Sequence, residues 1–142
     1  RSVVLREVDV PACTLMLFTD ARSPKVGQIT AQPQATLLAW SPVLGWQLRL
    51  RVRLAVQTSG LAVSSRWERL KMSPAAQDYL SSLPPGAPLP GQMPPPTPDR
   101  DSRNHFALVL AQVQAIDWLE LHPAGHRRAL FSADGHGQWV TP

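Results

Sequence analysis

The chain has 142 residues, 44% of them hydrophobic and 17% charged, which suits one folded domain and excludes a disordered chain. No apolar run approaches the ~20 residues that a membrane-spanning helix needs, so we expect no membrane partner and a cytoplasmic protein. The formal net charge is +4 and the only lysines are Lys25 and Lys71; the excess of arginine suits an anionic ligand but fits a GC-rich coding bias equally well.

Two short apolar segments open the chain. Residues 2–10 and 14–19 are rich in Val and Leu, and the break at Pro11 predicts that they pair as a β-hairpin. Cys13, the single cysteine, excludes an internal disulfide framework and favours a reducing compartment. Its apolar neighbours predict a small buried side chain.

A helix start with two cations follows the hairpin. Residues 23–32 predict a short helix, because Ser23 is a good N-cap and Pro24 fits the first helical position. Free backbone N–H groups and the helix dipole, with Arg22 and Lys25 beside them, would suit a phosphate group. An ordinary capped helix with solvated cations explains the same residues, and this stretch alone favours that simpler interpretation.

The clearest pattern lies in residues 46–57, after a predicted strand at residues 35–40. Apolar and polar side chains alternate strictly, which predicts a strand with one face in a core. The opposite face carries Arg49, Arg51 and Arg53. A solvated outer face is the favoured interpretation of this row, and a face turned to an anion or a partner is the alternative.

Two predicted helices and a proline-rich segment occupy the middle of the chain. Residues 61–70 and 74–83 are predicted as helices, with Ser73 as the N-cap of the second. Residues 84–98 hold much of the proline and predict an extended surface connector within the domain, in a loop that spans residues 84–105.

The C-terminal part predicts more β-structure. Residues 106–121 predict one or two strands, and residues 126–133 and 138–141 predict a hairpin joined by Asp134-Gly135. The total is about seven strands that pair largely in sequence, with two or three helices. We expect one domain, residues 1–142, in the form of a small antiparallel barrel with the helices outside.

Several segments, in order along the chain, resemble the pyridoxamine 5′-phosphate oxidase family of FMN-binding split barrels. They are "RSVVLREVD", "LFTDARSPKVGQI", the strand "WQLRL", the helical "RWERLKMSPAAQDYL", and "IDWLELHPAGHRRALF" with a final Trp and Pro. The form of the second and last segments is closer to a subfamily without an assigned substrate. The resemblance implies a mainly β (α+β) protein with an antiparallel Greek-key split barrel. Members usually carry a further helix and strand before the first Arg, so we expect this chain to be incomplete at its start.

The resemblance also implies a cofactor and its site. It implies a homodimer that binds FMN at the subunit interface, with residues from both copies. The FMN-binding residues that it implies are Arg1, Ser2, Val3, Val4, Arg6, Phe18, Thr19, Arg22, Ser23, Lys25 and Gln47. Arg127 and Arg128 stand where the family has phosphate- or substrate-binding arginines.

Departures from the family pattern affect the substrate side. Where the family has an Arg-x-His that binds substrate, position 129 is Ala, and Leu130 stands near the place of a flavin-binding Arg. Trp118 is one residue out of register with the family's Trp. We therefore expect a flavin-dependent oxidoreductase that does not oxidise vitamin B6, with no catalytic residue assigned. A non-catalytic flavin- or haem-binding protein is the alternative.

A nucleic-acid-binding barrel ranks last, because no aromatic side chains interleave with the arginine row. The four histidines lack the spacing of metal ligands, so no metal is expected.

Overall fold

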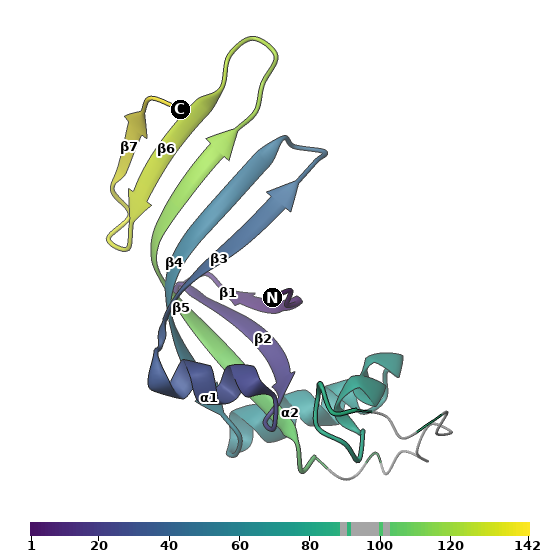
Figure 1. The fold of residues 1–142 in the computed structure, drawn as a ribbon. Helices are drawn as coiled ribbons and strands as arrows, with labels where there is room; N and C mark the ends of the chain where they lie inside the picture. The colour runs from purple at the N-terminus through teal and green to yellow at the C-terminus, as the bar shows by residue number, and fades with distance from the viewer. Residues whose placement is uncertain (89–90, 92–99, 101–102) are drawn as a thin grey trace.

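The computed structural model describes residues 1–88, 91, 100 and 103–142 (Figure 1). Within these residues the strands are β1 (Leu5–Asp9), β2 (Thr14–Asp20), β3 (Gln34–Ser41), β4 (Trp46–Gln57), β5 (Phe106–Glu120), β6 (Arg127–Ser132) and β7 (Gly137–Val140). The helices are α1 (Pro24–Ala31), α2 (Leu61–Leu70) and the 3-10 helix η1 (Pro74–Tyr79). The mainly antiparallel β architecture with short helices is confirmed. None of the described helices is long and apolar enough to cross a membrane.

One antiparallel sheet contains all the described strands, in the order β1-β2-β5-β4-β3, with β6 and β7 continuing from β5. In the described part of the chain this sheet stays open: it does not close into the complete barrel that the sequence predicted. Residues 106–121, predicted as one or two strands, form the single strand β5.

The long strand β5 changes its neighbour halfway along. Its first half pairs with β2 as far as Gln112, and its second half pairs with β6 from Ala115 onward. On its other side β4 follows it throughout, with a bulge between Arg51 and Val52. The sheet therefore has two regions, which Figure 1 shows diverging. We call β3, β6 and β7, together with the stretches of β4 and β5 that pair with these strands, the arm. The rest of the described structure, which includes α1 and α2, is the helical half.

A closed core lies beneath α2 in the helical half. Val63, Trp67 and Leu70 share one face of α2 because they are spaced by four and three residues, and all three are buried. They pack on Phe106 and Leu108 of β5. The Phe106 ring lies 5.1–5.3 Å from the rings of Phe18, Trp67 and Tyr79. These contacts fix α2 and η1 against one face of the sheet.

The predicted alternation in β4 is confirmed. Leu50 and Val52 are buried on one face with Ala111 of β5. Arg49, Arg51 and Arg53 are exposed on the other face, as the favoured interpretation required.

Two local predictions were wrong, and a third, the capping serines, is confirmed in position only. Cys13 is exposed rather than buried, because it occupies the β1–β2 turn with a φ of 47°. Ser23 and Ser73 do precede helices, but neither side chain makes a capping hydrogen bond. The helix predicted for residues 74–83 is the shorter η1. Residues 89–90, 92–99 and 101–102, most of the predicted proline-rich connector, lie outside the described residues.

Candidate functional site

A mainly apolar pocket of about 380 Å³ lies between β2 and α1. We call it the β2–α1 pocket. It is lined by Arg1, Val3, Leu17, Phe18, Thr19, Lys25, Gln28, Ile29, Gln32, Ala35, Thr36, Leu37, Leu54 and Val109. Five residues that the family resemblance implied for FMN therefore meet here: Arg1, Val3, Phe18, Thr19 and Lys25.

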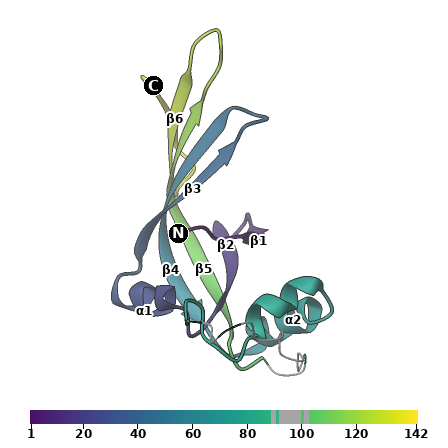
Figure 2. The ribbon, with the colours of Figure 1, turned by 45° about the vertical axis from the view of Figure 1, so that its right-hand side comes forward.

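The helix α1 contributes one complete face to this pocket. Lys25, Gln28, Ile29 and Gln32 recur at the three- and four-residue spacing of a helix face. No residue of α1 is buried. The helix therefore lies beside the sheet without burying any side chain against it. The face of α1 that lines the pocket is available to a ligand. Figures 1 and 2 show α1 and α2 on opposite sides of the helical half.

The polar groups of the pocket are cations and neutral donors. Arg1 donates a hydrogen bond of 2.7 Å from Nη2 to Oε1 of Gln28, which ties the N-terminal segment to α1. Lys25 adds an ammonium group from the first turn of the same helix. A guanidinium and an ammonium near a helix start match the chemistry of a phosphate monoester, and the aliphatic side chains match a flat apolar ring.

A second recess adjoins the pocket along the same face of the sheet. It has a volume of about 630 Å³ and shares Arg1, Val3, Leu17, Thr36 and Leu37 with the β2–α1 pocket. Ser2 and Leu5 line it from the N-terminal segment, so Ser2 also reaches this region. Val4 is exposed and lines neither cavity.

Arg22 lies outside the pocket and has structural partners. Its Nε and Nη2 donate to the two carboxylate oxygens of Asp20, at 3.1 and 2.7 Å. Its Nη1 and Nη2 also donate to the main-chain oxygens of Ser81, Ser82 and Leu83. The hydrogen bond with Asp20 raises the pKa of Arg22 further. This guanidinium therefore joins the end of β2 to the segment after η1. The neighbouring Ser23 is buried.

Arg6 and Gln47 also lie away from the pocket. Arg6 sits over the Phe18 ring, 5.8 Å from its centroid, on the side covered by η1. Burial raises the pKa of Tyr79, and a hydrogen bond with Arg6 opposes that shift. Gln47 pairs with Trp40 and Leu119 and shares the outer face of β4 with the arginine row.

Arg127 and Arg128 occupy opposite faces of β6, and each binds a carboxylate of β5. Arg127 pairs with Glu120, which also accepts a hydrogen bond from the indole of Trp46. Burial would raise the pKa of Glu120, but these two hydrogen bonds bring it below its usual value. Arg128 donates to both oxygens of Asp117 at 2.9 Å. Neither arginine lines the β2–α1 pocket.

The sequence interpretation missed Gln28, Ile29 and Gln32 as pocket residues. Their signal was available, because each lies on the helix face defined by Lys25. Among the described residues no group of three or more His, Cys, Asp or Glu side chains could hold a metal ion.

Comparison with known proteins gives two informative structures, whereas no family model and no curated protein matches the chain. A pyridoxamine 5′-phosphate oxidase-related, FMN-binding protein from Nostoc punctiforme superposes with a TM-score of 0.83 at 26% identity, covering 100% of this chain and 80% of that one. PhzG from Burkholderia lata, solved in complex with tetrahydrophenazine-1-carboxylic acid, superposes with a TM-score of 0.73 at 16% identity, covering 100% and 74%. PhzG supports the fold alone. The predicted resemblance is thereby confirmed: along its whole length the chain resembles the split-barrel proteins related to pyridoxamine 5′-phosphate oxidase.

Proposed function

We propose that this protein binds FMN in the β2–α1 pocket and acts as a flavin-dependent oxidoreductase. The observation that carries the proposal is the pocket itself, which brings Arg1, Thr19 and Lys25 together from three separate segments around apolar walls. The FMN-binding protein from Nostoc punctiforme, which matches the whole chain, supports the same cofactor.

The residues of the pocket fit this cofactor. Lys25 and Arg1 would hold the phosphate, with Gln28 orienting the Arg1 guanidinium through its hydrogen bond. Leu17, Leu54 and other aliphatic side chains would lie against the flat ring and exclude water from it. When bound, FMN supplies the redox chemistry, since no protein side chain carries electrons as readily. Arg1 and Lys25 are the ionisable side chains of the lining, so no general acid or base is assigned.

A homodimer is part of the proposal. The adjoining recess exposes apolar side chains of β1, β2 and β3, and the arm also exposes large apolar side chains, among them Trp139 and Phe131. Exposed apolar surface of this extent is typical of an interface. A second copy would close the open side of the pocket and supply residues that a single chain keeps away from it, such as Gln47.

The substrate is proposed to differ from pyridoxamine phosphate. Ala129 is buried in β6, and neither Arg127 nor Arg128 is free, because each is paired with a carboxylate. The complex of PhzG with tetrahydrophenazine-1-carboxylic acid shows that this fold accommodates other ligands.

Reconstitution with FMN tests the cofactor assignment. The wild-type protein should bind FMN with the shifted, structured visible spectrum of a protein-bound flavin. Lys25→Ala should weaken binding about tenfold or more, the usual loss for a charge-assisted contact. Arg53→Ala is the matched control: it also removes one positive charge, but from the exposed outer face of β4. Equal affinities for the two variants would refute the phosphate assignment.

Turnover then separates the two candidate functions. A flavin reduced by a nicotinamide and reoxidised over many cycles identifies an oxidoreductase. A bound flavin that does not turn over with a panel of reductants and oxidants indicates the non-catalytic alternative. A haem absorption band in place of the flavin spectrum would refute FMN as the ligand.

A further inference from the structure

The arm ends in two neighbouring turns, on the side of the molecule away from α1 and α2 (Figures 1 and 2). They are residues 42–45, between β3 and β4, and residues 121–126, between β5 and β6. We call these ten residues the arm tip. The main-chain N–H of Leu121 donates a hydrogen bond of 2.8 Å to the oxygen of Gly45, which joins the two turns. Gly45 has a φ of 65°, and a Cβ there would lie 2.7 Å from the Leu121 oxygen, so this contact requires glycine.

The arm tip exposes aliphatic side chains and carries no fixed charge. Val43 is 92% exposed, Leu44 is 53% exposed and Leu121 is 45% exposed. The other residues of the tip are Pro, Gly, Ala and two histidines, so it contains no Asp, Glu, Lys or Arg. Turns in contact with water are usually built from polar residues, Gly and Pro. The tip therefore presents apolar surface at the place where a polar turn is expected.

Two indole side chains flank the tip. Trp46 is the first residue of β4, and Trp40 pairs with Gln47, one residue farther from the tip. Because strand side chains alternate, the two indoles lie on opposite faces of the β3–β4 hairpin. Trp40 is 51% exposed and Trp46 is 37% exposed. An indole has an apolar body and a polar N–H, so it is favoured where an apolar region meets water.

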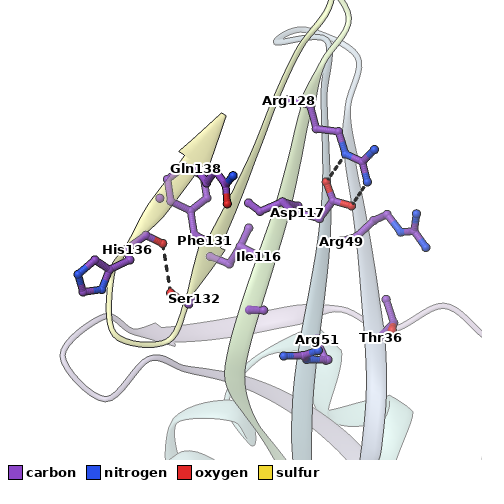
Figure 3. Close-up of a pocket in the computed structure, with 13 residues that line it drawn as sticks. Thr36, Arg49, Arg51, Ile116, Asp117, Arg128, Phe131, Ser132, His136 and Gln138 are labelled. Carbon is purple, nitrogen blue, oxygen red and sulfur yellow. Dashed lines mark hydrogen bonds and ion pairs between the residues drawn. The ribbon is translucent and has the colours of Figure 1, made fainter. Parts of the chain in front are cut away.

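Arginines follow the indoles along the arm. Arg49 is exposed on β4, three residues and about 10 Å from the start of that strand. The carboxylates of residues 34–53 and 115–132 are Asp117 and Glu120, and an arginine neutralises each. Arg127 pairs with Glu120, and Arg128 donates two hydrogen bonds of 2.9 Å to Asp117 (Figure 3). The surface behind the tip is therefore positive, without a free carboxylate to repel an anion.

We propose that the arm tip binds the surface of an anionic lipid membrane. Val43, Leu44 and Leu121 enter the boundary between the headgroups and the acyl chains, to the depth of about 5–10 Å that peripheral apolar segments reach. The indoles lie among the headgroups, and the arginines face the lipid phosphates. The order of apolar, indole and cationic side chains along the arm is thus the order of layers in a membrane interface.

A lipid surface fits the arm tip better than a protein partner does. A standard protein interface takes about 20–30 residues from each partner, whereas the tip has ten, and a lipid surface requires no matching shape. The proposed dimer covers the faces of the arm and not its end, so both contacts can form together. The tip shares no residue with the β2–α1 pocket, so this proposal does not depend on FMN. The sequence-based expectation of no membrane partner concerned spanning helices, which a peripheral contact does not need.

Co-sedimentation of the full chain with lipid vesicles tests the proposal. The probes are vesicles of phosphatidylcholine and vesicles in which a quarter of that lipid is replaced by phosphatidylglycerol. The anionic vesicles should bind about tenfold more tightly, because each arginine near a charged surface strengthens binding several-fold. Val43→Asp should weaken binding to both about tenfold or more, since it carries a carboxylate toward the acyl chains.

Val10→Asp is the matched control. Val10 is 74% exposed in the β1–β2 turn of the helical half, and this variant adds the same charge to the protein. Its effect on vesicle binding should stay below about twofold, because the added charge lies far from the tip and is screened by salt. Circular dichroism verifies that both variants fold.

Two further measurements examine the arginines and the depth of the tip. Arg49→Gln should lower the preference for anionic vesicles about threefold to fivefold and leave binding to neutral vesicles unchanged. Arg53→Gln should change neither, because Arg53 lies about 14 Å farther along β4, beyond the Debye length of about 8 Å. Bromine atoms on the acyl chains should quench the tryptophan fluorescence of the wild-type protein, and quench it less in Trp40→Phe.

Several results would overturn the proposal. One is that neither kind of vesicle binds the protein at millimolar lipid, and another is that Val10→Asp weakens binding as much as Val43→Asp. Binding that requires the anionic lipid but is insensitive to Val43→Asp would indicate a diffuse electrostatic contact instead. A higher dimer dissociation constant for Val43→Asp in sedimentation velocity would assign the tip to the contact between two copies of the chain.

Discussion

The helical half and the arm are built on the same two strands, yet they bury their side chains very differently. In the helical half Phe106 and Trp67 are each 1% exposed beneath α2. In the arm Trp139 is 69% exposed and Phe131 is 40% exposed, although both lie on strands of the same sheet. The apolar alternation of β4 continues through both regions. The difference lies in what covers the sheet, because the helices among the described residues pack on the first region and not on the second.

The helical half is stabilised by its own contacts, and we propose that the arm is covered by another molecule. Trp118 packs edge to face against both Trp46 and Trp139, 5.5 and 5.9 Å away, so the arm has an aromatic cluster of its own. Together with Phe131 these rings line an apolar recess that remains open in a single chain. A second copy is the covering partner that we propose.

The largest expected effect is a loss of stability in the helical half. Phe106→Ala removes a ring that touches three others and should lower the free energy of unfolding by about 3–5 kcal/mol. Trp139→Ala removes an even larger side chain but should cost less than about 1 kcal/mol in the monomer, because most of it is exposed. Urea denaturation at low protein concentration measures both. Equal losses would contradict the contrast between the two regions.

A smaller loss is expected at the ion pair of the helical half. The Asp20 side chain is 3% exposed, and Arg22 is its ion-pair partner. Arg22→Ala would leave that carboxylate buried without its cation and should destabilise the flavin-free protein by about 2–3 kcal/mol. Urea denaturation without FMN measures this loss. If Arg22→Ala weakened FMN binding and left this stability unchanged, the guanidinium would be a cofactor ligand after all.

The proposed dimer predicts an effect confined to the arm. Trp139→Asp places a charge in the exposed aromatic cluster and should raise the dimer dissociation constant about tenfold or more. The free energy of unfolding of the monomer should change little. Sedimentation velocity over a range of concentrations measures the dissociation constant, with Val43→Asp, an exposed turn residue of the arm, as the control. A wild-type protein that stays monomeric at all concentrations would exclude the dimer.

The sequence predicted the fold well because its strongest signals are periodic. The alternation over β4 defined its two faces, and Asp134-Gly135 marked the β6–β7 turn, where Gly135 has a φ of 85°. The same alternation predicts that Gln47 shares a strand face with Arg49. Its side chain therefore lies on the side of the sheet opposite the β2–α1 pocket of its own chain. The flavin contact that the family motif implies for Gln47 therefore stays a prediction that depends on a second copy of the chain.

The remaining site residues could not be located from spacing. The pairing of β1 with β2 shifts between Leu5 and Glu7, so Arg6 turns to the Phe18 side of the sheet, and no sequence pattern marks such a shift. Arg22 binds Asp20, two residues earlier, and carbonyl oxygens about 60 residues later in the chain. Only the hydrogen bonds to these distant carbonyl oxygens depend on the tertiary fold. They determine that the Arg22 guanidinium joins β2 to the segment after η1.

The smallest expected effect concerns the ion pair of the arm and depends on pH. Asp117 and Arg128 repeat the two-bonded geometry of Asp20 and Arg22, but their side chains are 21% and 34% exposed. The hydrogen bonds from Arg128 hold the pKa of Asp117 below its usual value. The folded protein therefore releases this proton more readily than the unfolded chain, whose Asp pKa is about 3.9. The resulting stabilisation is complete above that unfolded value and is lost as the pH falls through the folded one.

Because solvent screens this partly exposed pair, it should contribute only about 0.5–1 kcal/mol to the free energy of unfolding at pH 7. Other carboxylates also titrate in acid, so the informative quantity is the difference between the wild-type protein and Asp117→Asn. Urea denaturation should show that difference at pH 7 and show it shrinking toward pH 3, and 1 M salt should reduce it at pH 7. A difference that stays constant across this range would mean that Asp117 stabilises the arm through packing rather than through its charge. Asp117 and Arg128 would then stabilise the arm without an electrostatic contribution, whereas Asp20 and Arg22 stabilise the helical half as a buried ion pair. The contrast between the two regions would then include their ion pairs as well as their cores.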